Sequence, residues 1–357
     1  MSTFHGNSIS VSIFGASHAP SIGVELAGVP AGLPVDMAAL RAFMARRAPS
    51  SSAFSTRRRE PDEPVFESGV ANGVTTGETV RAVIYNKDAR SGDYASLANK
   101  PRPGHADYTA RMRYGEGVDL RGGGAFSGRM TAPLCIAGGL ALQWLERKGI
   151  SVGSHIAAIG GMADEAFDPV GVTAEELTAP GKKPFPTVSD TAGAAMLEAI
   201  DKAREELDSL GGIIECAAVG IPAGWGGELF DGVESTLARL VFSVPAVKGF
   251  ELGAGFGAAN LRGSENNDSF RFENGKVKTL TNNHGGLLGG LTSGMPLIFR
   301  AAIKPTPSIG KKQLTVDLST GKNAELEIGG RHDACIVPRA LPVMEACMAL
   351  ALLDARI

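Results

Sequence analysis

Glycine, with 47 of 357 residues, is the feature that most constrains what this chain can fold into. Aromatic residues make up only 6% of the sequence, whereas hydrophobic residues make up 43%, so the chain can still bury a large core. This combination is typical of a globular protein with many tight turns and close backbone approaches, rather than of a disordered chain.

The apolar pattern predicts strands that follow one another as often as they alternate with helices. Residues 9–14, 65–70, 80–85 and 213–219 are typical of strands, and helices are predicted to begin at Asp36, Thr131 and Asp190. The pattern favours an α+β fold, with antiparallel sheets around helices, over a doubly wound parallel sheet. The sequence of residues 28–32 (GVPAG) recurs in similar form at 220–224 (GIPAG), which is consistent with two pseudo-related halves.

No low-complexity linker divides the chain, so we expect a single domain over residues 1–357. Two polar segments, about 48–64 and 86–131, are predicted to be long mobile loops at the active site. The formal net charge of −3 argues against a nucleic-acid or membrane-surface protein. Because no apolar stretch approaches the roughly 20 residues of a membrane span, we expect a cytoplasmic protein without membrane partners.

Several kinds of site are disfavoured by the motifs that the chain lacks. Its four cysteines are far apart and form no CxxC pair, so we expect reduced thiols and no metal site. The glycine runs at 122–124 and 285–290 do not match the dinucleotide-binding fingerprint, and no GxxxxGK[ST] motif occurs. Rossmann and P-loop nucleotide sites are therefore disfavoured.

Prolines, glycines, guanidinium groups and one histidine are concentrated in residues 102–107 (RPGHAD) and 121–129 (RGGGAFSGR). Burial cannot explain segments with so little apolar content. Guanidinium groups bind carboxylates and phosphates bidentately and remain charged. Because His105 lies near Arg102 in the sequence, we expect its cationic form to be disfavoured until a phosphorylated ligand binds. The two segments predict an anion site with a proton donor.

Other segments extend this candidate site. His18 lies at the exit of the first strand, and two histidine acids would suit proton donation at different points of one ligand. Residues 331–333 (RHD) add a carboxylate that is either a base or the partner of a surface arginine. In residues 304–308 (KPTPS), fixed prolines, a lysine and two hydroxyls resemble a cradle for a phosphate or carbonyl. His284 is interpreted as a structural hydrogen-bonding residue.

In their order along the chain, these motifs resemble the chorismate synthase family. The resemblance covers almost the whole length, and the ordered set is highly specific although each motif alone is weak. The matching segments are 14–18, 46–47, 75–77, 102–108, 121–131, 245–249, 262–264, 283–290, 304–308 and 331–340.

The resemblance implies a β-α-β sandwich, with helices packed between antiparallel sheets, that assembles as a cytoplasmic homotetramer. It also implies a lyase that converts 5-enolpyruvylshikimate 3-phosphate to chorismate and phosphate by anti-1,4-elimination, the last step of the shikimate pathway to aromatic amino acids. The family uses reduced FMN without net redox change, and NADPH is a candidate reductant. Several guanidinium groups would neutralise the substrate's two carboxylates and phosphate.

The resemblance further implies residue roles. His18 and His105 would act as acids toward the leaving phosphate and the flavin, and Asp333 would take part with flavin N5 in removing the ring proton. Substrate would be bound by Ser17, Arg47, Arg102, Ser127, Arg129 and Arg331. FMN would be bound by Ala125, Phe126, Ser127, Pro245, Ala246, Gly289, Lys304, Pro305, Thr306, Pro307, Ser308 and Arg331, and Arg47 would also contact NADP.

Two positions depart from the common family pattern in ways that keep alternatives open. Ala53 and Ala125 stand where the family commonly has basic residues. An active lyase is therefore weighed against a protein that binds FMN or a phosphorylated metabolite without turnover. A third alternative, a flavin reductase, is disfavoured by the missing dinucleotide fingerprint.

Overall fold

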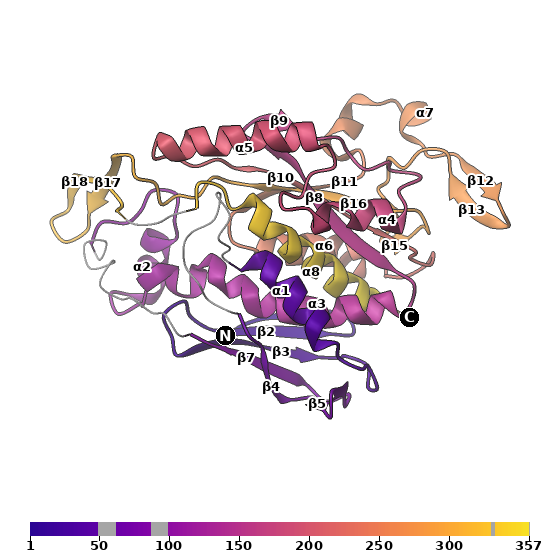
Figure 1. Ribbon diagram of the computed structural model, residues 1–357, viewed down its shortest axis with the longest axis horizontal. Helices are drawn as coiled ribbons and strands as arrows, with labels where there is room; N and C mark the ends of the chain where they lie inside the picture. Colours follow the sequence, from indigo (N-terminus) through magenta and orange to yellow (C-terminus); the bar gives the residue numbers. More distant parts are fainter. Residues whose placement is uncertain (49–61, 87–98, 330–332, 357) are drawn as a thin grey trace.

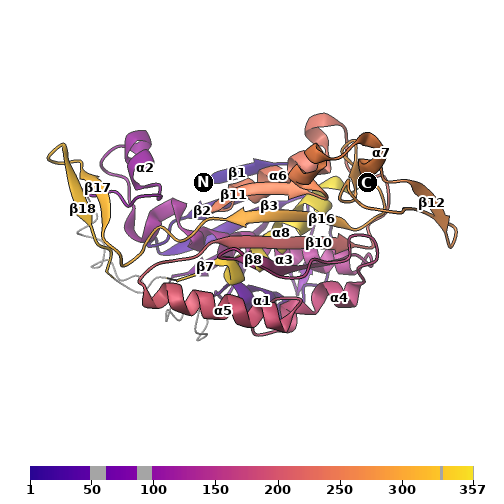
Figure 2. The ribbon, with the colours of Figure 1, turned by 90° about the horizontal axis from the view of Figure 1, so that it is seen from above.

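The computed structural model describes residues 1–48, 62–86, 99–329 and 333–356 (Figure 1). Two antiparallel sheets enclose a layer of helices, and α5 (Asp190–Glu205) covers the outer face of the second sheet (Figures 1 and 2). This arrangement confirms the predicted α+β fold with helices between antiparallel sheets. Ala53 and Arg331, which were assigned from the resemblance, lie outside the described residues.

The first sheet has the strand order β1-β2-β3-β7-β4, and every neighbouring pair is antiparallel. Alternation of apolar and polar residues explains why one face is buried: Ile22, Val24 and Leu26 of β3 all point into the core. The strands are β1 (Ser2–His5), β2 (Ser10–Gly15), β3 (Ser21–Ala27), β4 (Val65–Ser68) and β7 (Val80–Tyr85).

The second sheet has the order β11-β16-β10-β8-β9 and is also antiparallel throughout. Its strands are β8 (Ser151–Ile159), β9 (Met162–Ala163), β10 (Gly212–Val219), β11 (Val247–Leu252) and β16 (Leu297–Ile303). Short hairpins lie outside the two large sheets: β5 (Val70–Ala71) with β6 (Val74–Thr75), β12 (Phe270–Glu273) with β13 (Lys276–Thr279), β14 (Leu287–Leu288) with β15 (Leu291–Thr292), and β17 (Gln313–Asp317) with β18 (Lys322–Leu326).

The helices between the sheets belong to one core. Asp36 caps α1 as predicted, because its carboxylate accepts the N–H groups of Ala38 and Ala39 (both 2.9 Å). The α-helices besides α5 are α1 (Met37–Arg47), α2 (Asp107–Tyr114), α3 (Thr131–Glu146), α4 (Ala174–Thr178), α6 (Val233–Ser243), α7 (Gly263–Asn266) and α8 (Val337–Ala355). Short 3₁₀ segments occur at Arg121–Phe126, Gly128–Met130, Pro180–Lys182, Leu229–Asp231 and Gly255–Asn260.

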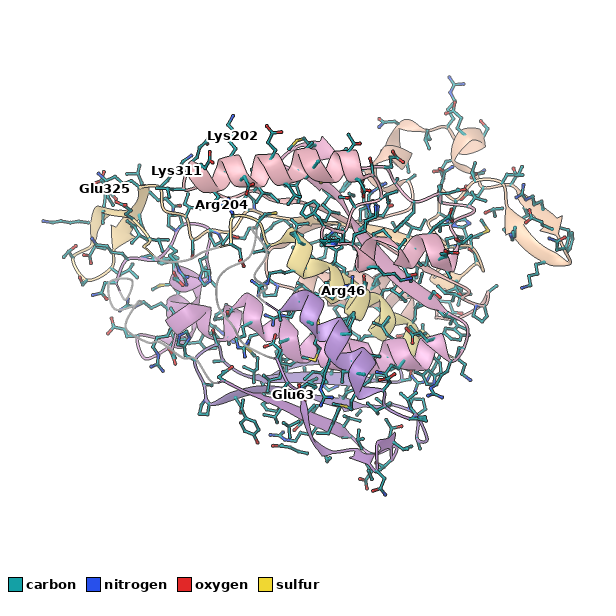
Figure 3. All side chains as sticks on the ribbon, viewed as in Figure 1. Arg46, Glu63, Lys202, Arg204, Lys311 and Glu325 are labelled. Atoms are coloured by element: carbon teal, nitrogen blue, oxygen red, sulfur yellow. The ribbon has the colours of Figure 1, made fainter. Side chains whose placement is uncertain are left out.

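Helices α3 and α8 connect the two sheets. α3 packs on β2, β3 and β7, α8 packs on β8 and β10, and the two helices pack on each other. A Cβ at Gly138 of α3 would lie 2.2 Å from Cβ of Ala346 on α8, so this close approach requires glycine. The buried Glu345 of α8 is neutralised by Arg46 of α1, labelled in Figure 3, through contacts of 2.6 and 2.7 Å.

The two large sheets repeat one order of elements. The first half runs β2, β3, α1, β4, β5–β6, β7, α3, and the second runs β8, β10, α6, β11, β14–β15, β16, α8, with the remaining elements as additions. The equivalent strands also occupy equivalent places, since β2-β3-β7-β4 matches β8-β10-β16-β11. The similar sequences of residues 28–32 and 220–224 therefore belong to two pseudo-related halves.

A pair of threonines repeats the same hydrogen bonds in the two halves, and we call this pair the threonine latch. Thr75 Oγ1 donates to the carbonyl of Pro30 (2.6 Å) and accepts the N–H of Leu33 (3.0 Å). Thr292 Oγ1 likewise donates to the carbonyl of Pro222 (2.6 Å) and accepts the N–H three residues after that proline (2.9 Å). The latch fixes each recurring proline segment to a small hairpin.

The predicted loops differ in part from the structure. Residues 49–61 and 87–98 lie outside the described residues, so the expected mobility of those parts stays a prediction. The described part of the second segment is not a continuous loop, because it contains α2 and two 3₁₀ segments. The proline and glycine content of the segment concealed this helix, whose apolar side is short. No helix among the described residues is both long and apolar enough to span a membrane.

Candidate active site

Three consecutive glycines allow two histidines to approach one loop. The φ angles of Gly122, Gly123 and Gly124 are 58°, 91° and 55°, in the left-handed region that favours glycine. A Cβ at Gly122 would lie 2.3 Å from Cε1 of His18, and a Cβ at Gly123 would lie 3.3 Å from Nε2 of His105. The glycine run therefore brings the two predicted acids to one place.

Two predicted serines lie on the same loop. The Gly124 carbonyl accepts the N–H of Ser17 (3.1 Å). Ser127 Cβ is 3.3 Å from the position that a Cβ at Gly123 would take, and Ser127 Oγ accepts the N–H of Arg129 (3.3 Å). The structure thus gathers both serines around the histidines. Ala125, two residues before Ser127, is exposed.

His105 is held by a carboxylate that belongs to the same sequence motif. His105 Nδ1 lies 2.6 Å from Oδ1 of Asp107. Arg102 binds that carboxylate as well, with 2.7 Å from Nε to Oδ2 and 2.8 Å from Nη2 to Oδ1. Burial would raise the pKa of Asp107, but hydrogen bonds from Arg102 and His105 hold it well below its usual range.

The structure adds a carboxylate to the expected surroundings of His105. Oδ1 of Asp107 lies 2.6 Å from Nδ1 of the ring, closer than Nη2 of Arg102 at 3.1 Å. Arg102 is itself buried, and its guanidinium is occupied by Asp107 and by Oγ of Ser308 (3.3 Å). The positive charge of Arg102 would therefore already be balanced by the Asp107 carboxylate when a substrate anion binds.

Arg47 and Arg129 form a second cluster around one buried carboxylate. Asp62 accepts from Nη1 of Arg47 and from Nη1 of Arg129, the latter at 2.8 Å. Burial would raise the pKa of Asp62, but the two guanidinium groups lower it. Thr131 accepts from Nε of Arg47 (3.2 Å), and Oδ1 of Asn86 accepts from Nε of Arg129 (2.9 Å). Among the described residues, two buried guanidinium groups therefore meet at one buried carboxylate.

The predicted base lies next to this cluster. Oδ2 of Asp333 accepts from Nη1 of Arg339, and Nε of Arg339 donates to the backbone carbonyl of Arg47 (3.0 Å). Burial lowers the pKa of Arg339, and the Asp333 carboxylate opposes that effect. Arg339, at the beginning of α8, therefore connects the carboxylate of Asp333 to the end of α1.

The segment 304–308 packs against the histidine motif. Nζ of Lys304 donates to the carbonyl of Gly104, and the Lys304 N–H donates to the carbonyl of Ala246 (2.9 Å). Burial, with a contribution from Lys248, lowers the pKa of Lys304. Ala246 has a φ of 77°, a strained value for a residue with a Cβ. Lys304, Ser308 and Ala246 are thus brought to the site.

The structure does not bring Gly289 to the same place. Gly289 forms the turn between β14 and β15, and β15 lies toward the opposite end of the long axis from α2 (Figure 1). A cavity of about 220 Å³ is lined by Arg102 and Asp107. Arg111 and Arg121 of the same chain segment also line it.

Four site residues were missed by sequence analysis: Asp62, Asn86, Asp107 and Arg339. Asp107 was inside the quoted motif, and its spacing of two residues from His105 was a usable signal. Asp62 is one of three acids that follow a run of arginines, and an acid near such a run is a candidate counter-charge. No local signal identified Asn86, because its role depends on Arg129, which lies 43 residues away.

Two histidines on a glycine loop, close to two buried guanidinium groups, are typical of an enzyme site that takes an anionic small molecule. The chorismate synthase family model matches residues 9–357. The chorismate synthase of Thermococcus gammatolerans is 48% identical over 350 residues, which cover 98% of this chain and 96% of that protein. That of Korarchaeum cryptofilum is 43% identical over 349 residues, with the same coverage of 98% and 96%.

A solved structure described as the crystal structure of chorismate synthase has a TM-score of 0.78 and 26% identity, covering 98% of this chain and 92% of that one. This chain belongs to the chorismate synthase family. It is therefore a lyase of the shikimate pathway, which serves amino-acid biosynthesis, and the predicted resemblance is confirmed.

Proposed function

We propose that the chain converts 5-enolpyruvylshikimate 3-phosphate to chorismate and phosphate by anti-1,4-elimination in the presence of reduced FMN. The observation that carries the proposal is the approach of His18 and His105 to one glycine run, with Cβ positions at Gly122 and Gly123 only 2.3 and 3.3 Å from their rings. Two proton donors at one place suit a reaction that releases an anionic leaving group.

Substrate binding is assigned to the cluster of Arg47, Arg129 and Asp62. Both guanidinium groups are buried, and both donate to the Asp62 carboxylate. Guanidinium groups bind carboxylates and phosphates bidentately, so they suit a substrate with two carboxylates and a phosphate and would stabilise charge that develops on the leaving phosphate. Ser17 and Ser127 would donate hydroxyl hydrogen bonds to the same ligand. Arg331 stays a prediction.

Proton removal from the ring is assigned to Asp333. Its carboxylate is held by Arg339, which also contacts the Arg47 carbonyl, so the base is fixed beside the arginines that bind substrate. His18 and His105 would donate protons to the leaving phosphate and the flavin. In this assignment the proton that leaves the ring goes to Asp333, and the phosphate leaves with the electron pair of its C–O bond.

The residues around Lys304 fit a bound flavin. Thr306 Oγ1 is buried and has no hydrogen-bond partner among the described residues, which marks a position for an outside polar group. Backbone strain at Ala246, next to Lys304, is of the kind found at ligand sites. Pro245, Ala246, residues 304–308 and residues 125–127 would hold FMN, which when reduced and bound supplies an electron-rich ring without net redox change.

The proposed NADP contact of Arg47 has a structural cost. Arg47 is only 4% exposed, and its guanidinium is bound to Asp62 and Thr131. A nucleotide would have to displace Asp62 to reach it. Replacing the chemical reductant of FMN by NADPH in an anaerobic assay tests this part: formation of chorismate supports NADPH as reductant, and its absence removes NADP from the proposal.

We further propose a cytoplasmic homotetramer. Large apolar side chains are exposed in the second half, including Leu229, Phe230, Phe256 and Phe272, as expected for surfaces that associate. Because the β14–β15 turn that holds Gly289 lies toward the opposite end of the long axis from α2 (Figure 1), Gly289 would contact FMN only from a second copy. Light scattering in solution tests the assembly, and a monomer would contradict both statements.

The decisive experiment combines the chain with 5-enolpyruvylshikimate 3-phosphate and chemically reduced FMN under anaerobic conditions. Formation of chorismate and phosphate in equal amounts is the expected result. No chorismate at saturating ligand would overturn the proposal. Calorimetry that shows tight binding of FMN and substrate without elimination would instead support the alternative of a binding protein without turnover.

A further inference from the structure

Asp107 lies in the first turn of α2 and is almost fully buried. Its carboxylate receives four donors. Oδ2 accepts from the backbone N–H of Arg102 (3.0 Å) and from Arg102 Nε (2.7 Å), and Oδ1 accepts from Arg102 Nη2 (2.8 Å) and His105 Nδ1 (2.6 Å). Every lone-pair direction of this carboxylate is therefore used within residues 102–107.

These contacts determine which nitrogen of His105 carries a fixed proton. An ionised carboxylate only accepts hydrogen bonds, so Nδ1 at 2.6 Å must donate to Asp107. Arg102 Nη2, 3.1 Å from Nδ1, is also a donor, so both groups converge on the carboxylate and do not bond to each other. The nitrogen whose protonation can change is Nε2, which faces Gly123 and lies 3.4 Å from Arg102 Nη2.

We propose that Asp107 is a positioning residue that fixes the ring orientation and tautomer of His105, so that Nε2 presents its proton to the ligand. The inference rests on the proposed function for its effect on turnover. In the proton transfer, the Nε2–H bond of the His105 imidazolium breaks, the proton goes to the anionic acceptor, and His105 is left neutral with its Nδ1–H still bonded to Asp107. Arg102 acts through Asp107 by holding the carboxylate and connecting it to Ser308.

The variant Asp107→Asn separates this role from simple packing. Its amide has nearly the same shape but only one oxygen. That oxygen would take the Oδ2 position, because both groups there, the Arg102 N–H and Nε, can only donate. The NH₂ group would then face His105 Nδ1, which must accept, so the tautomer would be reversed and the imidazolium would be disfavoured.

Two measurements test the proposal. The first is the ¹⁵N NMR spectrum of histidine-labelled protein at neutral to alkaline pH, without ligands. We expect the Nδ1–H tautomer of His105 in the natural chain and the Nε2–H tautomer in Asp107→Asn. An unchanged tautomer in Asp107→Asn would overturn the proposal, and this result is independent of whether the chain is a lyase.

The second measurement is turnover by Asp107→Asn, His105→Ala and the double variant. If Asp107 acts through His105, Asp107→Asn loses roughly 10²–10⁴-fold in kcat, the loss expected for removing a general acid. The double variant then loses no more than His105→Ala. A double variant with the product of the two single losses would assign Asp107 a separate structural role and overturn the proposal.

A matched control keeps the variants comparable. Asp201→Asn removes a carboxylate that pairs with an arginine, Arg204, at 2.9 Å on the exposed face of α5 (Arg204 is labelled in Figure 3). We expect natural turnover and an unchanged His105 tautomer in this variant. If the natural chain itself makes no chorismate, the proposed function fails, whereas the tautomer measurement still decides whether Asp107 positions His105.

Discussion

The two pseudo-related halves have the same framework but carry different chemistry at equivalent places. The connection from β7 to α3 holds Arg102, Arg129 and the proposed proton donor His105, whereas the equivalent connection from β16 to α8 holds residues 304–308 and Asp333. The two connections touch where Lys304 donates to the Gly104 carbonyl. The site therefore lies where equivalent connections meet, and each could acquire its own residues without disturbing a sheet.

Each half also holds a histidine against carboxylates, and the two histidines differ in how many of their nitrogens are bound to a carboxylate. His105 has Nδ1 on Asp107, whereas its Nε2 faces Gly123 and lies 3.4 Å from Arg102 Nη2. His155 on β8 is 0% exposed, with Nδ1 3.0 Å from Asp164 and Nε2 3.0 Å from Glu215. A ring bound at both nitrogens can only stabilise the fold, whereas a ring bound at one nitrogen can transfer a proton.

The largest expected effect comes from replacing the histidine that is bound at one nitrogen. His105→Ala should lower turnover by roughly 10²–10⁴-fold, as for loss of a general acid, because no other described side chain donates from Nε2's position. FMN affinity and the free energy of unfolding should stay close to those of the natural chain. Stopped-flow assays and denaturant titration measure these quantities, and natural turnover would remove His105 from the mechanism.

The opposite pattern is expected from the histidine that is bound at both nitrogens. His155→Gln should destabilise the protein by about 3–5 kcal/mol, because it leaves two buried carboxylates without their shared cation. Turnover per folded molecule should not change, since His155 lies in the second sheet. Urea titration and an assay below the unfolding transition measure the two effects, and a loss of turnover without a loss of stability would contradict the comparison.

The equivalence of the two halves can be tested by removing the hydroxyl group of the threonine latch in each half. Thr75→Val and Thr292→Val should each cost about 1–3 kcal/mol, because each removes the two hydrogen bonds of a buried threonine. The costs should be similar, since the bonds match within 0.1 Å. Thr178→Val is the control, because Thr178 is half-buried and its hydroxyl donates to the Ala174 carbonyl within α4 (2.9 Å). A large effect on one side only would show that the halves are not equivalent there.

The smallest expected effect is a pH dependence that belongs to His155. Burial lowers its pKa, but hydrogen bonds to Asp164 and Glu215 prevail and raise it. A raised pKa means that this stabilisation is complete below about pH 6.5, the unfolded value, and is lost as the pH rises through the folded value. Each pH unit that separates the two values corresponds to about 1.4 kcal/mol of stability. Thermal unfolding between pH 6 and 9 should show the loss in the natural chain, and His155→Gln should lack it.

Sequence reasoning predicted the elements whose signals are local. The strand Val80–Tyr85 and the helix capped by Asp36 were found because apolar spacing and a cap lie within a few residues. The helix α2 was missed because its segment is rich in proline, glycine and charge. In the site, the motifs identified His18, His105 and Asp333, but the pairing of Asp62 with two arginines depends on three distant segments that only the fold brings together.

The threonine latch has a consequence for the origin of the chain. Equal bonds at equivalent turns, within sheets of equal strand order, are explained by duplication of one ancestral unit. Two identical copies related by a two-fold axis would have placed the same connection against itself. Fusion into one chain removed that identity, so one copy could acquire the proposed proton donors while the other acquired the proposed flavin-binding residues and base.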